Sequence, residues 1–184
     1  MKYATMIFFG VVFCVLAFFA GTYNSLATTQ VEVESSWSQV ENQMQRRYDL
    51  IPNLVNTVKG YTKHEEEVFR AISEARAKMG SAQTPVQKDE ANTELSGALS
   101  RLMMVVENYP NLKADTHYQQ LMDELAGTEN RIAVARKDYV AVVQKYNGKV
   151  VRFPTNVVAG MCGFDKMETF KADEGAKTAP KVEF

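Results

Sequence analysis

Apolar residues along the middle of the chain recur in steps of three and four positions. From residue 37 onward this spacing holds for Trp37, Val40, Met44, Tyr48, Ile51, Val55 and Val58. Such a pattern places the apolar residues on one face of a helix, close to the heptad seam of a coiled coil. We therefore expect a helix over about residues 23–59. Pro52 is expected to kink or break this helix, and Gly60 suits the position just after its end.

Two shorter stretches continue the same helical spacing. Thr62 and Glu65 fit a capping box at the start of a second helix, which ends near residues 80–81. Pro85 suits the first turn of a third helix, and that helix stops before Pro110. The residues expected to face inward on these two helices are Val68, Ile72, Ala75, Met79, Leu95, Leu99, Leu102, Val106 and Tyr109.

A fourth helix is predicted from Asp115 or Thr116 to about residue 153, just before Pro154. Its expected seam residues are Tyr118, Leu121, Leu125, Thr128, Ile132, Ala135, Tyr139, Val142 and Tyr146. The first and fourth helices are each about 55 Å long at the rise of an α-helix, and the middle two are roughly 30–36 Å long. These lengths predict an all-α fold: an N-terminal transmembrane helix followed by an antiparallel up-down four-helix bundle over residues 23–153. The shorter helices would pack on the half that is distant from the membrane.

The N-terminal segment is apolar throughout. Residues 3–22 read YATMIFFGVVFCVLAFFAGT and contain no charged side chain. A helix of about 20 such residues spans the hydrocarbon core of a bilayer, so we interpret residues 1–22 as the anchor of a single-pass membrane protein. The alternative is a cleaved signal peptide with a small-residue site at residues 25–27. Lys2 precedes the segment and the first basic residue after it is Arg46, which favours a cytoplasmic N-terminus and an extracytoplasmic bundle.

A second apolar stretch follows the fourth helix. Residues 154–164 read PTNVVAGMCGF and carry no charge. If the fourth helix returns to the bilayer, this stretch is a membrane-proximal segment, with Val157, Val158, Met161 and Phe164 at the interface. The alternative is a loop that caps the lower end of the bundle. Residues 165–184 are expected to form a flexible tail.

Composition and motifs exclude several classes of function. The 184 residues have a formal net charge of −1, so bulk electrostatics do not favour nucleic acid as a partner. The two cysteines, Cys14 and Cys162, do not form a disulfide framework. The sequence has no phosphate-binding glycine loop, G-x-S-x-G or H-E-x-x-H motif, and neither His64 nor His117 has the glutamate of di-metal bundles three residues earlier. We expect no catalytic residue, no metal ligand and no cofactor.

Charged and amide side chains interrupt the apolar pattern of the first and fourth helices. Those that we select as a possible polar network or partner surface are Arg46, Arg47, Asp49, Asn53, Glu129, Asn130, Arg131 and Arg136. Glu129 is expected to pair with Arg46 or Arg47 across on the first helix. Alternatively, Glu129 pairs with a group near Arg136. The aliphatic part of the Arg136 side chain is expected to lie along apolar side chains. Arg46 and Arg47 beside Asp49 predict local ion pairs, or else a site for anions or lipid headgroups. A buried network of this kind fixes helix register, which is a structural role.

Four stretches resemble the LemA family in order and spacing. They are YNSL at 23–26, SWSQVENQMQRRYDLIPNLVNTVKGYTKHEEEVFRAISEARAK at 36–78, NTELSGALSRLMMVVENYPNLKAD at 92–115 and GTENRIAVARKDYVAVVQKYN at 127–147. The ending APKVEF is also similar to that family. The resemblance implies a single-pass membrane protein, mostly bacterial, with an antiparallel helical bundle. In this family a magnetosome protein is tied to membrane formation, and bundles on the cytoplasmic side have also been proposed. The resemblance carries over no catalytic residues.

These patterns lead to two expectations for function. The first is a membrane-anchored helical scaffold or adaptor of the bacterial inner membrane. It would self-associate as a homo-oligomer and organise the lipid bilayer surface or protein partners that the sequence does not identify. The alternative is a membrane-tethered sensor that binds a small ligand or anion, with a polar pocket around Arg46, Arg47, Asn130 and Arg131. Neither expectation includes enzymatic activity, because the chain offers no positioned acid, base or nucleophile.

Overall fold

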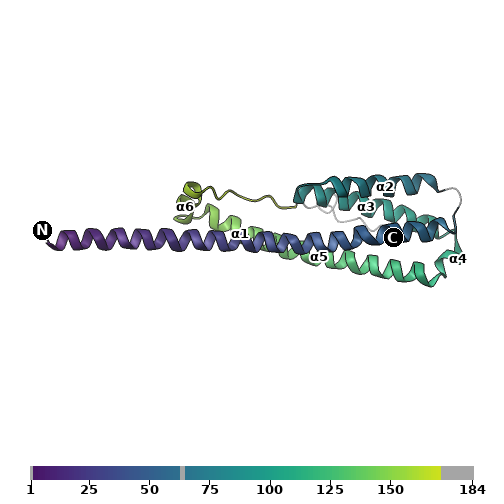
Figure 1. Ribbon diagram of the computed structural model, residues 1–184, viewed down its shortest axis with the longest axis horizontal. Helices are drawn as coiled ribbons and strands as arrows, with labels where there is room; N and C mark the ends of the chain where they lie inside the picture. Colours follow the sequence, from purple (N-terminus) through teal and green to yellow (C-terminus); the bar gives the residue numbers. More distant parts are fainter. Residues whose placement is uncertain (1, 63–64, 171–184) are drawn as a thin grey trace, which may run out of the picture.

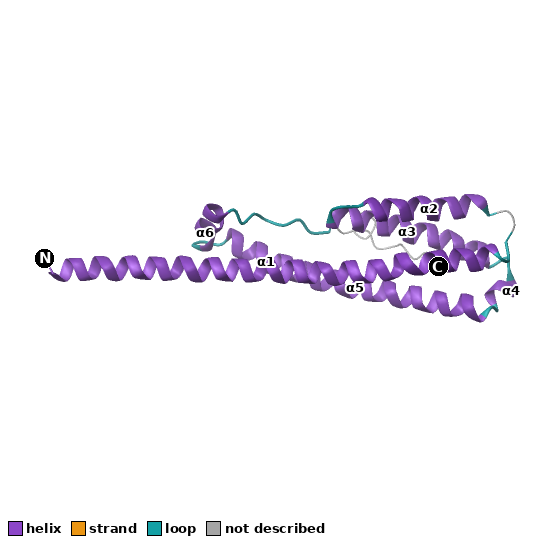
Figure 2. Ribbon diagram, in the orientation of Figure 1, coloured by secondary structure: helices purple, strands orange, loops and turns teal. Residues whose placement is uncertain are grey.

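The computed structural model describes residues 2–62 and 65–170 and is almost entirely helical (Figures 1 and 2). No strand occurs among these described residues. The helices are α1 (Lys2–Lys59), α2 (Glu66–Ser81), α3 (Pro85–Val106), α4 (Pro110–Lys113), α5 (Thr116–Val151) and α6 (Thr155–Cys162). The molecule is elongated, and the N-terminal part of α1 extends alone beyond all the other helices (Figure 1).

The expected anchor and the expected first helix are one continuous helix. α1 has 58 residues, which corresponds to about 87 Å at the rise of an α-helix. It continues through Pro52, so the predicted break is absent; Ile51 and Leu54, on either side, are each 1% exposed, and their packing holds the helix together. The apolar part of α1 is long enough to cross a membrane, and within the described residues none of that window is buried.

α1 and α5 form an antiparallel pair. Near one end Lys149 Nζ lies 2.9 Å from Ser25 Oγ, and at the other end the Tyr61 hydroxyl donates to Asp115 at 2.8 Å. The residues buried on the two helices include Val33, Val40, Met44, Ile51, Leu54, Val58, Tyr118, Leu125, Thr128, Ile132, Tyr139, Val143 and Tyr146. Most of the predicted seam is therefore confirmed. Val143 is fully buried, and Val142, which was expected on the seam, is half-buried against the same core.

α2 and α3 form a second antiparallel pair. Lys78 lies 2.7 Å from Glu94 near the short loop between them, and the Tyr109 hydroxyl lies 3.1 Å from Glu65 at their other end. The capping box predicted at Thr62 is wrong: α2 begins at Glu66 without a side-chain cap, and the Thr62 hydroxyl donates to a carbonyl oxygen of the preceding turn. A capping box forms instead at the start of α3. Thr84 there accepts from the Gln87 backbone, directly before the proline predicted for the first turn.

The α2/α3 pair lies beside the distal half of the α1/α5 pair (Figure 1). Close backbone packing occurs mainly within each pair, whereas contacts between the pairs depend on longer side chains. Lys88 of α3 pairs with Glu41 of α1, and Asp89 of α3 pairs with Arg136 of α5. All four long helices nevertheless contribute to one hydrophobic core, which includes Ile72, Leu95 and Leu102.

The C-terminal part of the described chain departs from the expected flexible tail. Gly163, with a φ of 76°, ends α6, and residues 163–170 then return along the bundle. The backbone N–H of Met167 donates to Asn147 at 2.9 Å, and the Phe170 ring lies 5.2 Å from the Tyr139 ring. Residues 165–170 therefore lie along the bundle, and the side chain of Phe170 provides packing that the polar composition did not indicate. Residues 171–184 lie outside the described residues.

Asp115 is the N-cap of α5 and gives a prediction for acid stability. Hydrogen bonds from the Tyr118 backbone at 2.9 Å and the Tyr61 hydroxyl hold the pKa of Asp115 below its ordinary value. A carboxyl group whose pKa is depressed by folding stabilises the native state above its unfolded pKa. That stability is lost as the pH falls through the folded pKa.

Asp115→Asn is therefore expected to reduce the loss of stability between neutral pH and about pH 3, because asparagine also caps helices but does not titrate. The measurement is the thermal unfolding midpoint of the full-length protein in detergent at both pH values. Asp123→Asn, an exposed change on the same helix, is the control. Equal acid sensitivity of the two variants would contradict the assignment.

Candidate functional site

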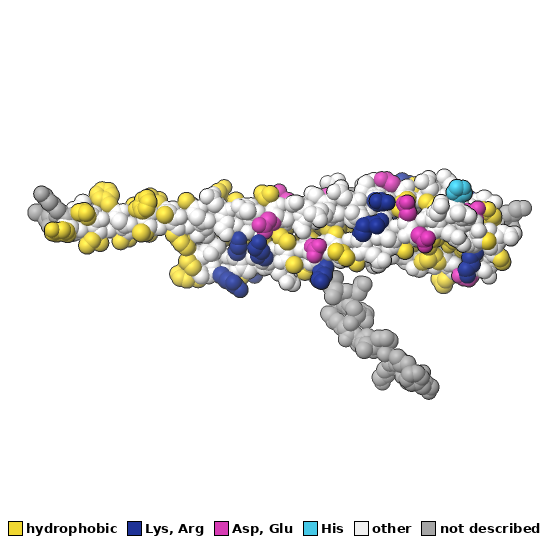
Figure 3. All heavy atoms as spheres, turned by 90° about the horizontal axis from the view of Figure 1, so that it is seen from below, with side chains coloured by type: hydrophobic (Ala, Val, Ile, Leu, Met, Phe, Trp, Pro, Cys, Tyr) yellow, Lys and Arg dark blue, Asp and Glu magenta, His cyan; other side chains and the backbone are white. Residues whose placement is uncertain are grey.

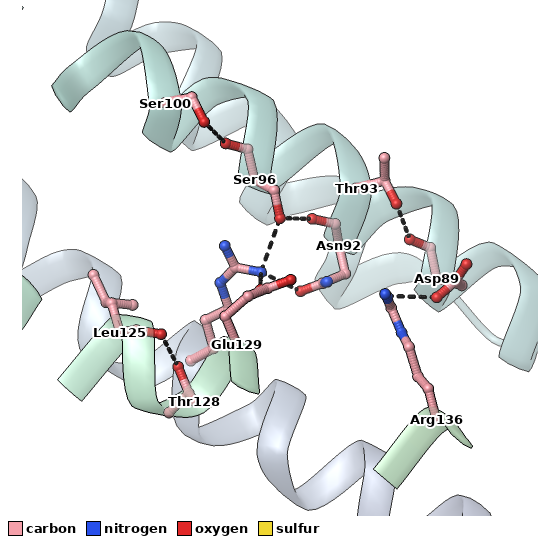
Figure 4. Close-up of polar contacts among 10 residues, drawn as sticks. Asp89, Asn92, Thr93, Ser96, Ser100, Leu125, Thr128, Glu129 and Arg136 are labelled. Carbon is pink, nitrogen blue, oxygen red and sulfur yellow. Dashed lines mark hydrogen bonds and ion pairs between the residues drawn. The ribbon is translucent and has the colours of Figure 1, made fainter. Parts of the chain in front are cut away.

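The centre of the polar cluster is Arg47, which projects from α1 into the junction between α3 and α5. Its side chain is only 6% exposed. Nη1 donates to Asn92 Oδ1 at 2.9 Å and to Ser96 Oγ at 3.0 Å, and it also pairs with the Glu129 carboxylate. Figure 4 shows Asn92 and Ser96 from one helix and Glu129 from another converging on the same point. Three helices are thus joined through one guanidinium group.

The electrostatics of Arg47 reflect its burial. Burial lowers the pKa of Arg47, Glu129 opposes that change, and the positive charge of Arg136 lowers the pKa further. Arginine remains charged at neutral pH even so, because its ordinary pKa is far above that range. The cation therefore depends on Glu129 for its counter-charge. Among the described residues, Arg47 Nε is buried and has no hydrogen-bond partner.

A second charged contact lies further along α5. Arg136 pairs with Asp89, and their side chains are 24% and 21% exposed. Figure 4 shows Arg136 extending from α5 toward Asp89 on α3. Together with the Lys88–Glu41 pair, this contact fixes α3 against both long helices. Charged groups that are mostly removed from water are costly to separate, so these contacts define how the two helix pairs fit together.

An apolar groove opens beside the Arg47 cluster. It has a volume of about 270 Å³ and lies among α1, α3 and α5. Its lining residues include Leu54, Leu99, Met103, Met122 and Leu125, with Arg47, Ser96 and Glu129 supplying polar groups. Met103 is 41% exposed and lies on the accessible side. The groove could take a small apolar group with one polar end.

The selected residues of the polar network do not all come together. Arg47, Glu129 and Arg136 join the contacts described above, and the predicted pairing of Glu129 with Arg47 is confirmed. The remaining ones lie apart: Arg46, Asp49, Asn53, Asn130 and Arg131. Arg46, Asn130 and Arg131 therefore do not line the groove beside Arg47.

The separated residues make ordinary surface contacts. Arg46 lies 3.9 Å from Glu124, and not in an ion pair with Asp49 as expected. Asp49 accepts from Gln45 four positions earlier at 2.9 Å. Arg131 donates to Gln43 at 3.2 Å, and the side chains of Asn53 and Asn130 are exposed. The physical reason is helical geometry, because neighbours in sequence point 100° apart and so reach different surfaces.

Three polar residues of α3 were missed by the sequence interpretation. Asp89, Asn92 and Ser96 form a polar line at spacings of three and four, within a helix that otherwise presents apolar residues to the core. Asn92 is 1% exposed, which is unusual for an amide and requires a partner. Their spacing could have predicted this contact, since polar residues on the inward face of one helix indicate a polar partner on the helix packed against it.

The predicted membrane-interface residues divide between two faces of α6. Val157 and Met161 are 53% and 73% exposed, whereas Val158 is 3% exposed. The Phe164 ring is half-buried and lies 5.6 Å from the Tyr23 ring. Phe153, at 83% exposed, was missed and belongs with the outward-facing residues. Val158 and Phe164 therefore face the bundle, because a helix can present only half of its residues outward.

The described residues contain no group of three His, Cys, Asp or Glu side chains that could hold a metal ion. Cys14 and Cys162 are free, the first exposed and the second half-buried. The geometry thus offers a structural polar junction, an apolar groove and an outward-facing apolar helix near the base.

Comparison with known proteins identifies the family. The sequence pattern of the LemA family matches residues 36–184. This chain belongs to the LemA family. The match begins within α1, beyond its apolar segment, and includes the RRYDLIPNL and GTENRIAVAR stretches that carried the sequence resemblance.

Among the relatives of this LemA-family chain, magnetosome protein MamQ 2 of Paramagnetospirillum magneticum is 30% identical over 182 residues. That alignment covers 85% of this chain and 67% of the relative. Magnetosome protein MamQ of Magnetospirillum gryphiswaldense is 28% identical, with 80% of this chain and 64% of the relative covered. Protein LemA of Metamycoplasma hominis is 26% identical, with 85% and 72% covered. These relatives and the apolar N-terminal helix indicate a membrane protein.

Proposed function

We propose that this LemA-family chain is a membrane-anchored scaffold or adaptor. The observation that carries the proposal is the continuity of α1, which runs from the exposed apolar segment into the bundle without a break. In this proposal α1, α2, α3 and α5 act as one up-down four-helix bundle. Residues 23–59 would hold the distal end about 55 Å from the bilayer surface.

The proposal includes self-association and a location in the bacterial inner membrane. The relatives named as magnetosome proteins support a role at a membrane surface. The single basic residue before the apolar segment supports an N-terminus in the cytoplasm and a bundle outside it. The proposed activity is assembly and positioning, not catalysis, since Arg47, Glu129 and Arg136 each pair with a group on a neighbouring helix.

Detergent extraction of the full-length protein, followed by size analysis and electron microscopy, tests self-association. Rings or arrays with the anchors on one face would support a scaffold that assembles. A monomer at every concentration would overturn self-association and leave the adaptor form, to be pursued by crosslinking from α5. Protein released from membranes without detergent would overturn anchoring itself.

The orientation has its own test. Thr93→Cys introduces an exposed thiol on α3, in a chain whose Cys14 and Cys162 are replaced by serine. Labelling of intact cells by a membrane-impermeant thiol reagent supports an extracytoplasmic bundle. Labelling only after the cells are broken would place the bundle in the cytoplasm.

The groove beside Arg47 favours a second candidate, a membrane-tethered ligand-binding module. A groove of about 270 Å³ next to an unpartnered Arg47 Nε could hold a small apolar molecule with a hydrogen-bond acceptor. Met103→Trp, at the accessible side, should fill the groove. A small molecule that copurifies with the native protein and is absent from this variant would support binding. Its absence from both proteins would count against it.

A further inference from the structure

The position of α6 relative to α1 places it at the end of the apolar segment. Residues 3–18 of α1 are exposed, Phe19 is the first to be partly covered, and Thr22 and Leu26 are buried. α6 packs against both α1 and α5 at this level (Figure 1). Residues 3–22 span about 30 Å, which equals the thickness of a hydrocarbon core. α6 would therefore lie where a bilayer surface meets the bundle.

The outward face of α6 is apolar. Val158 and Ala159 are buried against the bundle, which accounts for the inward face. Val157 and Met161 are four residues apart, so they share the opposite face, and Phe153 is exposed just before the helix. A helix that only capped the bundle would present polar residues to water. In this helix Asn156 is the exposed polar side chain and no residue is charged, which is typical of a segment at the surface of a bilayer.

Basic side chains lie next to this apolar face. Lys149 donates to Ser25 and Thr29, which are neutral, and the acidic group that its charge acts on is Glu32, which already pairs with Lys145. Arg152 follows the last turn of α5, is exposed, and has no ion pair among the described residues. Figure 3 shows basic side chains gathered beside hydrophobic ones where the single apolar helix meets the rest of the molecule.

Acidic residues near this patch only partly offset its charge. Glu32 pairs with Lys145 at 2.8 Å, and that pair is neutral as a unit. Asp165 lies close to Tyr146 on the return segment. With Lys149, Arg152 and Lys166 counted against Asp165 and Glu168, one positive charge remains, and it lies at the level of phospholipid headgroups. Lys149 and Arg152 lie at the C-terminal end of α5, where cations interact favourably with the helix dipole. That interaction accounts for the two basic residues but not for the exposed apolar side chains beside them.

We propose that this base of the molecule binds an anionic phospholipid. Arg152 would bind the phosphate, since a guanidinium group donates two parallel hydrogen bonds to phosphate oxygens. Lys149, whose three donors are engaged with Ser25 and Thr29, would add positive charge nearby. Val157, Met161 and Phe153 would contact the acyl chains. The occupant is a lipid of the bilayer that holds α1, because the apolar face continues directly from the apolar segment of α1. This inference rests on the proposed membrane anchoring.

The test uses the full-length protein in mixed micelles of phosphatidylcholine and phosphatidylglycerol, with native mass spectrometry to count retained lipid. The native protein is expected to retain phosphatidylglycerol in preference to phosphatidylcholine. Arg152→Gln should reduce that preference about fivefold, because one basic residue strengthens binding to an anionic surface by about that factor. Arg101→Gln makes the same change of charge at an exposed position of α3, and it should leave the preference for phosphatidylglycerol unchanged. No preference in the native protein, or equal losses in both variants, would overturn the proposal.

The apolar half of the site is tested by hydrogen exchange in lipid nanodiscs. Val157→Ser with Met161→Ser should speed amide exchange across residues 153–162. Val134→Ser with Met104→Ser changes the same residue types at positions 61% and 65% exposed, and should leave that exchange unchanged. Equal exchange of α6 in both double variants would overturn lipid contact. Failure of the native protein to enter nanodiscs would instead overturn the membrane anchoring, so the two outcomes are distinct.

Discussion

Replacing Glu129 with alanine is expected to lower the free energy of unfolding by about 3 kcal/mol. The change leaves Arg47 without its counter-charge at a position where only 6% of the side chain is exposed. Removing one partner of a buried ion pair destabilises the protein by more than the intact pair stabilises it, because the other charge stays buried without a counter-charge. Glu129 itself is 44% exposed, so water can partly replace it, and the expected loss is at the lower end of such effects.

The measurement is thermal unfolding of the full-length protein in detergent, followed by circular dichroism. A loss of this size corresponds to a fall of about 6–12 °C in the midpoint for a chain of this length. Glu124→Ala is the matched control on the same helix, because Glu124 faces Arg46 at 3.9 Å with both side chains about half exposed. That change should cost about 0–1 kcal/mol.

A triple variant separates charge from packing. Arg47→Met with Asn92→Leu and Glu129→Leu removes both charges together with the buried amide that accepts from Arg47, and fills the space with apolar atoms. It should recover much of the stability lost in Glu129→Ala, since well-packed apolar residues often replace a buried ion pair without loss. Similar midpoints for Glu129→Ala and Glu124→Ala would show that Arg47 does not depend on Glu129.

Replacing Ile132 with alanine should have an effect of comparable size, about 3 kcal/mol. Ile132 is fully buried in the core between the long helices, so the change loses transfer energy and leaves a cavity. Val134→Ala, two residues away and 61% exposed, should change the unfolding free energy by less than about 0.5 kcal/mol. Urea unfolding of the full-length protein measures both. Equal effects would mean that α5 is not held by the predicted seam.

Periodicity predicts the helices well and their ends less well. Apolar spacing placed α5 and most of its buried face, because one face of a helix must meet the core whatever the partner. The ends depend on weaker local signals: Thr62 with Glu65 and Thr84 with Gln87 both fit a capping box, but only the second forms. The first fails because Thr62 instead donates to the carbonyl of Val58 and closes α1.

Contacts between helices were harder to predict than the helices themselves. The sequence left Arg46, Arg47 and the neighbourhood of Arg136 open as partners of Glu129, and Arg47 is the one that pairs with it. It did not indicate that Asn92 completes the same junction, because the rotation of α3 relative to α1 is set by packing. Phe170 shows the same limit, since one aromatic residue in a polar stretch gives no periodic signal, yet it packs against Trp37 and Tyr139.

Because α1 is one continuous helix, a change in its tilt at the membrane moves the distal end of the bundle. A helix that is stiff from the bilayer to the far tip transmits any tilt of its embedded part over about 55 Å, so a tilt of about 10° moves the tip by about 10 Å. Apolar helices tilt more when the surrounding bilayer is thinner than their apolar length. The lateral position of the α2/α3 end would then follow local bilayer thickness, and neighbouring molecules would meet at their tips or separate as the membrane thins or thickens.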